Sequence, residues 1–301
     1  MKDMTKGRIV GIKRFGIHDG DGIRTTLFLK GCPLRCIWCH NPEAISPKPQ
    51  VAYLKEKCIG CGECVSICSA HSFSGGKHVY DRNKCVCCGR CENVCLGEAL
   101  AFYGKEVSPE EVLPLLTEDR IFYGGSGGGV TLSGGEPLLQ AGFSMELLKL
   151  LKAEGVHTAV DTCGFAGKGD IDKIIGYTDI FLYDIKFYDN KKHVQYTGCT
   201  NKPIIENLKY IDGKGKPIEI RIPLVPTIND DQVVPIGRFL STLKHIVKVK
   251  LLPYYNFSSS KYEALEMENT LPAAETPDDY QLAEAVSILK SFGLNAVNGK
   301  E

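Results

Sequence analysis

The chain has 301 residues, 43% of them hydrophobic, and its 36 Lys and Arg residues balance its 36 Asp and Glu residues. Zero net charge disfavours a nucleic-acid partner, and the lack of a long apolar run disfavours a membrane or exported protein. We therefore expect a cytoplasmic protein with one substantial core and no nucleic-acid or membrane partner.

The segment from Gly7 to Lys30 contains two strand-like pieces around a polar, glycine-rich turn, residues 16–24. The turn is too polar for a core, and it directly precedes the first group of cysteines. We expect it to lie beside those cysteines. The alternative is an ordinary solvated turn.

Fourteen cysteines stand out in this chain, and eleven of them fall in three ordered groups. A reducing cytosol does not favour disulfides, so these groups point to metal ligation. The other three, Cys87, Cys163 and Cys199, match no ligand pattern.

The first group has the spacing C-x-x-x-C-x-x-C, at Cys32, Cys36 and Cys39. Three thiolates on a 4Fe-4S cluster would leave one iron free for another ligand, and an open position is typical of catalytic metal centres. The alternative is a structural zinc site completed by His40 or a distant cysteine.

The other two groups are copies of one pattern, C-x-x-C-x-x-C-x-x-x-C, in register with each other. This duplication is typical of bacterial two-cluster ferredoxins, in which the fourth cysteine of each copy ligates the other cluster. It predicts a ferredoxin-like insert at residues 54–104 with two 4Fe-4S clusters. The predicted ligands are Cys58, Cys61, Cys64 and Cys95 for one cluster, and Cys85, Cys88, Cys91 and Cys68 for the other. Zinc is the alternative, which the register disfavours.

Beyond the insert, strand-like and helix-like segments alternate. Ser108 to Glu111 has the sequence of a capping box, which predicts a helix to about Arg120. The predicted strands are 130–132, 156–160, 180–185, 218–225 and 247–252, and the predicted helices are 143–154, 170–175, 204–211, 232–243 and 277–292. Together with the strand before Cys32, they indicate an α/β fold, a partial (βα)6 barrel made of residues 1–53 and 105–301.

Polar motifs follow the predicted strands, where a barrel has its active groups. Gly134 and Gly135 allow a ligand to approach the backbone closely, and Glu136 can accept hydrogen bonds from an ammonium group. Asp184 and Lys186 are two residues apart on a strand and should share a face, where their charges compensate each other. An ordinary salt bridge is the alternative.

The first cysteine group, with Trp38 before its third cysteine, resembles the signature of the radical S-adenosylmethionine (SAM) enzymes. Together with the insert and the Gly-Gly-Glu, Asp-Thr and Asp-x-Lys motifs, it makes the chain resemble the glycyl radical enzyme activating enzymes of that superfamily. The resemblance implies reductive cleavage of SAM and removal of a glycine α-hydrogen from a partner enzyme. The products would be a glycyl radical, 5'-deoxyadenosine and methionine.

The resemblance also implies roles for individual residues. Asp19 would hold the partner's peptide, although Asp21 stands where the family's D-G-P-G-I-R pattern has proline. A monovalent cation would lie near Asp161 and Thr162. Tyr255 stands where the family more often has histidine. The residues expected to contact SAM are Trp38, His40, Gly134, Gly135, Glu136, Asp161, Thr162, Asp184, Ile185, Lys186, Arg221 and Tyr255.

The implied partners are a glycyl radical enzyme as substrate and flavodoxin or ferredoxin as electron donor to three 4Fe-4S clusters, in a monomer from an anaerobic organism. Three alternatives remain. The first is a radical SAM enzyme acting on a small molecule or another peptide. The second is a non-catalytic electron carrier, which would have no need for Gly134, Glu136, Asp184 or Lys186. The third is an activase of an anaerobic ribonucleotide reductase, usually shorter and without the insert.

Overall fold

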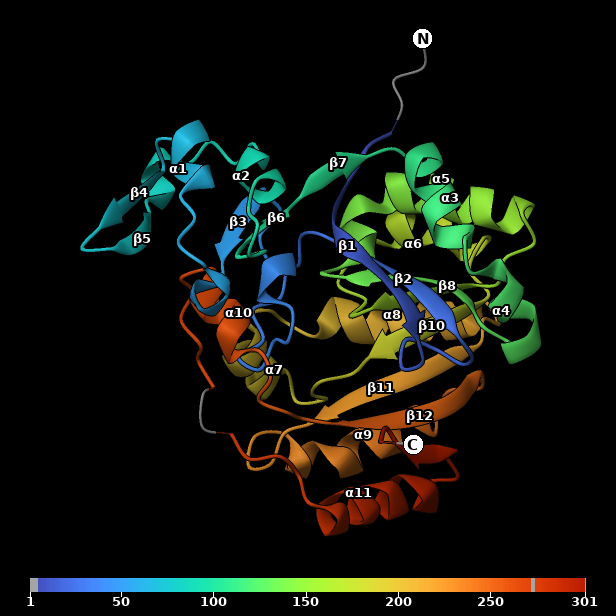
Figure 1. Ribbon diagram of the computed structural model, residues 1–301. Coiled ribbons are helices and arrows are strands. Elements are labelled where there is room, and N and C mark those ends of the chain that lie inside the picture. The colour runs from blue at the N-terminus through green and yellow to red at the C-terminus, as the bar shows by residue number, and fades with distance from the viewer. Residues whose placement is uncertain (1–4, 272–273, 301) are drawn as a thin grey trace.

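The computed structural model describes residues 5–271 and 274–300, and a nine-stranded sheet forms most of the molecule (Figure 1). The strands from β13 to β2 in the spatial order all pair in parallel, whereas β1 pairs antiparallel with both β2 and β7. In spatial order the strands are β13 (Ala296–Asn298), β12 (Ile246–Pro253), β11 (Ile218–Leu224), β10 (Ile180–Asp184), β9 (Thr158–Thr162), β8 (Gly129–Gly134), β2 (Arg24–Leu29), β1 (Gly7–Gly16) and β7 (Lys105–Val107).

The predicted α/β fold with a parallel sheet is confirmed, and β8 to β12 correspond to the five predicted strands. The sequence did not predict β13, because three residues carry too little periodicity to distinguish a strand from a loop. This strand extends the parallel sheet beyond β12. Among the described residues, no helix has both the length and the apolar character needed to cross a bilayer.

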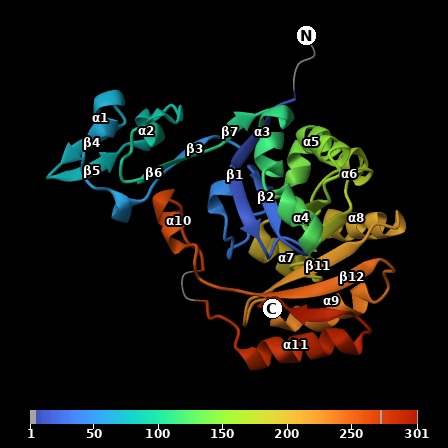
Figure 2. The ribbon, with the colours of Figure 1, turned by 45° about the vertical axis from the view of Figure 1, so that its right-hand side comes forward.

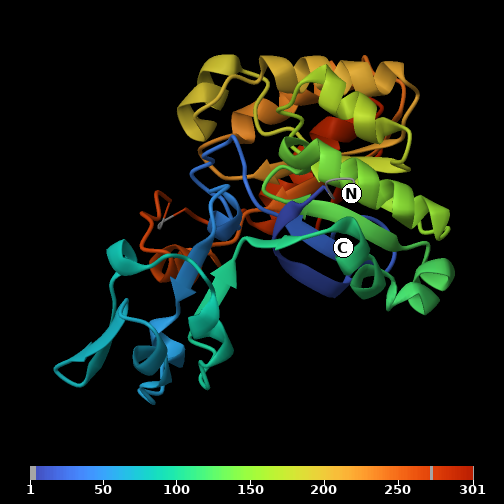
Figure 3. The same ribbon diagram turned by 90° about the horizontal axis from the view of Figure 1, so that it is seen from above.

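Helices cover the outer face of the sheet (Figures 2 and 3). The predicted capping box is present, since Ser108 and Glu111 exchange hydrogen bonds at the start of α3. Three helices outside the insert were not predicted: α4 follows the predicted end of α3, α7 is mostly polar, and α10 is short. The α-helices outside the insert are α3 (Pro109–Thr117), α4 (Arg120–Ser126), α5 (Ala141–Ala153), α6 (Lys168–Ile175), α7 (Asn190–Thr197), α8 (Lys202–Gly213), α9 (Val233–Leu240), α10 (Ser259–Ala264) and α11 (Asp279–Ser291).

The alternation of side chains along each strand separates a hydrophobic core from a polar interior. In β11, Ile218, Ile220 and Ile222 pack in the core with the surrounding helices. Glu219 and Arg221 project to the opposite face, where they lie 3.7 Å apart. The polar strand-end residues therefore gather inside the curve of the sheet.

The cysteine-rich insert extends to one side of the sheet (Figures 1 and 2). Strand β3, just before the predicted start of the insert, pairs with β6 and forms its stem. Its elements are β3 (Gln50–Tyr53), α1 (Glu63–Ile67), β4 (His71–Ser74), β5 (Lys77–Tyr80), α2 (Arg90–Asn93) and β6 (Leu100–Tyr103). Five short 3-10 helices complete the described structure: η1 (Pro42–Ala44), η2 (Lys55–Lys57), η3 (Arg82–Lys84), η4 (Pro137–Gln140) and η5 (Asp230–Gln232).

Candidate active site

The loop after β2 carries the first three cysteines, and main-chain hydrogen bonds hold it from two sides. The N–H of Cys32 donates to the carbonyl of Ile45 (3.0 Å), and the N–H of Arg35 donates to the carbonyl of Thr197 at the end of α7 (2.8 Å). The loop is therefore fixed by contacts with α7, a helix far away in the sequence.

This loop forms one wall of a cavity of about 680 Å³ inside the curved sheet. The other walls come from the carboxyl ends of the parallel strands, where barrel enzymes place their active groups. The predicted site residues that line the cavity are Cys32, Cys36, Trp38, Cys39, His40, Gly134, Gly135, Asp161, Thr162, Asp184, Lys186, Arg221 and Tyr255.

The three sulfurs suit a cluster better than a single zinc ion. Zinc ligands must converge to within about 2.3 Å of one ion. Among the described residues, the one group compact enough to hold a single ion contains none of these cysteines. Burial raises the pKa of Cys39 to about 11 and also raises that of Cys36, so these thiols lose their protons only when a metal binds them.

Asp184 and Lys186 form an ion pair in the cavity wall, with 2.7 Å between Oδ2 and Nζ. Burial by itself would lower the pKa of Lys186, but the Asp184 carboxylate raises it above its usual value. Lys186 therefore keeps its charge at neutral pH, and the ion pair can offer both signs to a zwitterionic ligand.

A second charged group lies at the ends of β9 and β11. Arg221 Nη1 is 3.2 Å from Oδ2 of Asp161, which also accepts a hydrogen bond from the Ser133 hydroxyl (2.6 Å). Burial raises the pKa of Asp161 to about 6, against the opposing effect of Arg221, so the carboxylate is still ionised at pH 7.

Two predicted SAM contacts do not line the cavity. Ile185 packs in the hydrophobic core. Glu136 is fully buried behind the wall, where its carboxylate accepts hydrogen bonds from the Thr162 hydroxyl (2.6 Å), the Leu138 N–H (3.0 Å) and the Cys163 N–H (2.8 Å). The Gly-Gly-Glu motif predicted that Glu136 accepts hydrogen bonds. It did not predict that the donors would be residues of the same chain.

Cys163 lines the cavity, although it matched no ligand pattern. Its Sγ is 2.9 Å from Glu136 Oε2. Contact with Cys32 and burial both raise the pKa of the Cys163 thiol, so it stays protonated. The only sequence signal was its place directly after Asp161 and Thr162 at a strand end.

The glycine-rich turn before β2 lies at the cavity, as expected. His18 lines it and accepts a hydrogen bond from Arg221 through its carbonyl. Asp19 does not line the cavity, and its carboxylate accepts a hydrogen bond from the Thr26 hydroxyl (2.9 Å). Asp21, the residue in place of proline, forms an ion pair with Lys248 on β12 (2.6 Å).

In the insert, the cysteines lie in two groups. Cys58, Cys61, Cys64 and Cys95 line one cavity. For the other set, burial raises the pKa of Cys91 to about 11, with further contributions from the nearby Cys85, Cys68 and Cys88. In each group the fourth cysteine comes from the other copy of the repeat, which is the exchange typical of two-cluster ferredoxins.

Comparison with known proteins shows the family of this chain. Residues 82–240 match the family model described as the Radical SAM superfamily. The chain is 40% identical to the trans-4-hydroxy-L-proline dehydratase activating enzyme of Clostridioides difficile, over 97% of this chain and 98% of that one. The chain belongs to the glycyl radical enzyme activating enzymes.

Two further relatives have other partners. The benzylsuccinate synthase activating enzyme of Thauera aromatica is 39% identical (97% of this chain, 92% of that one), and the choline trimethylamine-lyase activating enzyme of Oleidesulfovibrio alaskensis is 37% identical (95% and 96%). As a radical SAM activating enzyme, this protein uses a 4Fe-4S cluster and SAM to generate a glycyl radical on a partner glycyl radical enzyme.

Proposed function

We propose that this activating enzyme binds its catalytic 4Fe-4S cluster on Cys32, Cys36 and Cys39 and binds SAM in the adjoining cavity. The observation that carries the proposal is that one cavity joins these three sulfurs to the charged pairs at the strand ends. When bound on these three cysteines, the cluster would supply the electron for reductive cleavage of SAM, and the 5'-deoxyadenosyl group would take up the glycine hydrogen atom.

The charged side chains would orient SAM. Its methionine end carries an ammonium and a carboxylate, which the Asp184–Lys186 pair can match with opposite charges. The backbone of Gly134 and Gly135 lies open to the cavity and can approach the amino group. Glu136 supports this wall from behind, so we assign it a positioning role in place of the predicted contact.

Aromatic rings would hold the adenine. Tyr254 stacks on His40 with 5.4 Å between the ring centroids, and Trp38 packs on Phe187 at 5.8 Å. Tyr255 lines the same side of the cavity. Flat apolar faces beside polar ring atoms suit a nucleobase.

The carboxylate of Asp161 and the hydroxyl of Thr162 would hold a monovalent cation or meet the SAM carboxylate through Arg221. Both residues line the cavity, and burial raises the pKa of Asp161. The Thr162 hydroxyl donates to Glu136, so only its oxygen would be available to a cation. Asp19 would hold the partner's peptide, because the turn that carries it meets Arg221 at the cavity.

The insert, residues 54–104 with its stem strand β3, would carry two further 4Fe-4S clusters and pass electrons from flavodoxin or ferredoxin toward Cys32. The two sets of four cysteines support this assignment. The enzyme would act as a monomer that docks transiently on its partner.

The partner is proposed as a class. Relatives that activate a hydroxyproline dehydratase, a benzylsuccinate synthase and a choline lyase are 37–40% identical to this chain. Because the sequence identity is nearly the same for relatives with different partners, it reflects the activation reaction that they share and does not identify one partner.

Electron paramagnetic resonance (EPR) tests the proposal. The anaerobically reconstituted, reduced protein is mixed with SAM and, one at a time, the glycyl radical enzymes of the same organism. A carbon-centred doublet with one of them identifies the partner. No doublet with any of them, from protein that has intact clusters and still forms 5'-deoxyadenosine, would point to another radical SAM substrate.

A further inference from the structure

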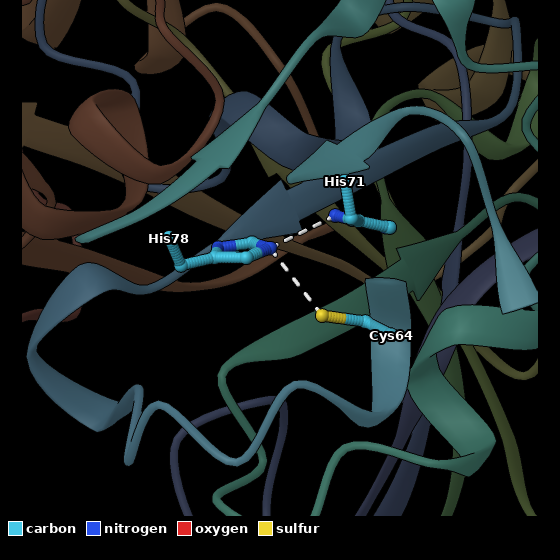
Figure 4. Close-up of side chains that lie close together, drawn as sticks. All are labelled: Cys64, His71 and His78. Atoms are coloured by element: carbon cyan, nitrogen blue, oxygen red, sulfur yellow. Dashed lines mark hydrogen bonds between the residues drawn. The ribbon is translucent and has the colours of Figure 1, made fainter. Parts of the chain in front are cut away.

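Two histidines of the insert lie against one of its cysteines (Figure 4). His78 Nε2 is 3.3 Å from Cys64 Sγ and 3.1 Å from His71 Nδ1. The histidines come from the paired strands β4 and β5, and Cys64 comes from α1. Two functions compete for this group: a site for one metal ion, or a hydrogen bond to the sulfur of a cluster ligand.

The geometry of the cavity favours the hydrogen bond. Cys64 shares its cavity with Cys58, Cys61 and Cys95, and His78 is part of the same wall. Cys64 therefore faces a space that three further sulfurs enclose. A single ion on Cys64 and the two histidines would leave those three sulfurs without a metal.

A cluster on these cysteines determines which nitrogens carry hydrogen. The thiolate of Cys64 would be an acceptor only, so His78 Nε2 must carry a proton and donate it. His71 Nδ1 must then be unprotonated, because two N–H groups 3.1 Å apart would oppose each other. The remaining nitrogens, His78 Nδ1 and His71 Nε2, are buried without a hydrogen-bond partner among the described residues.

Packing holds His78 in this orientation. The His71 ring lies between those of His78 and Tyr80, with centroid distances of 5.1 and 4.9 Å. The edge of Tyr53 approaches His78 at 4.6 Å. Because His71 is only 3% exposed, neither imidazole can turn away without opening this stack.

The second copy of the repeat lacks this arrangement. Cys91 holds the place that corresponds to Cys64, and no side chain of the described residues donates to its sulfur. The Tyr80 hydroxyl hydrogen-bonds to Cys85, as the Tyr53 hydroxyl does to Cys58 in the first set. The exposed Arg90, whose Nε is 3.5 Å from Cys88 Sγ, also lies at the second set, but no imidazole of the described residues does. The duplicated cysteines thus have unequal surroundings.

We propose that His78 donates a hydrogen bond to Cys64 and so raises the reduction potential of the cluster on Cys58, Cys61, Cys64 and Cys95. The inference rests on the two clusters proposed for the insert. Hydrogen bonds to cluster sulfurs stabilise the more negative, reduced state. The tuned cluster is the outer one, since α1 lies farther from the large sheet than α2 does (Figures 1 and 2).

The test is a redox titration of the full chain followed by EPR. Replacing Cys32, Cys36 and Cys39 by alanine removes the catalytic cluster and leaves the signals of the insert. In this background, His78→Phe keeps a ring in the aromatic pocket but removes the donor. At the original midpoint potential we expect the reduced-to-oxidised ratio of one cluster to fall about tenfold, a shift of about 59 mV, with the other cluster unchanged.

Two controls separate the hydrogen bond from packing. His78→Gln retains an N–H and should restore most of the lost potential, whereas His71→Phe leaves the donor in place and should shift the potential less than His78→Phe. In the unsubstituted chain labelled with isotopic histidine, pulsed EPR should detect one coupled nitrogen, so the test does not depend on how well a variant folds.

The outcomes are distinct. An insert that holds no clusters would overturn the relay and this inference together. Two intact clusters with unchanged potentials in His78→Phe, or no coupled nitrogen in the labelled chain, would overturn the hydrogen bond alone. One zinc ion per chain that is lost in His71→Phe would replace it with the single-ion site.

Discussion

The thiol of Cys163, which lines the same cavity as Cys32, lies 2.9 Å from the carboxylate of Glu136, which is buried behind the cavity wall. Burial raises the pKa of Glu136, while hydrogen bonds from Cys163 and Thr162 oppose the rise. Glu136, which was predicted to contact SAM, thus stabilises the wall that SAM would lie against.

Cys163→Ala should lower stability by about 1.5–3 kcal/mol, the usual contribution of a hydrogen bond to a charged group. Cys163→Ser, which keeps a donor, should lose less. Glu136→Gln should lose more stability than either. Its NH2 group would replace one of the two carboxylate oxygens and face donors that now donate to that oxygen. Thermal unfolding of the three variants measures the order, and equal losses would contradict it.

Cys36→Ala should abolish SAM cleavage even with a strong chemical reductant, since two thiolates cannot hold the catalytic cluster. Cys61→Ala should slow cleavage about tenfold with a protein electron donor, but leave it nearly unchanged when a chemical reductant acts directly. The assay is 5'-deoxyadenosine formation. Complete loss in both variants, with the catalytic cluster still present in Cys61→Ala, would contradict the relay.

Asp19→Ala should lower the yield of glycyl radical about tenfold while SAM cleavage without the partner is unchanged, because this carboxylate is proposed to hold only the peptide. Asp21→Ala is the matched control in the same turn. Its ion pair with Lys248 is exposed on the Asp21 side and should contribute at most about 1 kcal/mol of stability. Radical yield by EPR separates the two, and an equal effect would argue against a peptide role for Asp19.

Gly164→Ala should destabilise the fold by about 3 kcal/mol. Gly164 has a φ of +71°, and an added Cβ would lie 1.7 Å from the Tyr183 hydroxyl. Gly169→Ala, in α6 with no neighbour within 4 Å, should instead stabilise by roughly 0.5–1 kcal/mol. Melting temperatures test the opposite signs.

Stability should decrease as the pH falls below about 6.5, in part because of His193. This side chain is 1% exposed, its Nδ1 is 2.6 Å from the Cys199 carbonyl, and burial lowers its pKa. The unfolded chain then binds the proton first, so stability is lost toward acid by up to about 1.4 kcal/mol per pH unit. His193→Asn keeps a donor but does not titrate. Its melting temperature should depend less on pH between 7.5 and 5.5 (roughly the His range), and an unchanged slope would exclude His193 as a source.

Patterns of residues close together in the sequence predicted most of the candidate metal ligands and several of the strands and helices. The spacings at Cys32, Cys58 and Cys85 predicted metal ligation, because ligands of one centre can come from a single loop. The alternation of apolar runs predicted β8 to β12, and the capping box predicted α3. Each of these signals depends on residues within a few positions of one another.

The tertiary structure decided what depends on contacts between distant segments. Only the fold placed Glu136 behind the cavity wall, brought Cys163 into it and set His78 against Cys64. No periodicity records such contacts, since they form when strands far apart in the sequence meet at the same edge of a sheet. The sequence by itself determined which centres this protein can build, and the packing of its strands determined what surrounds them.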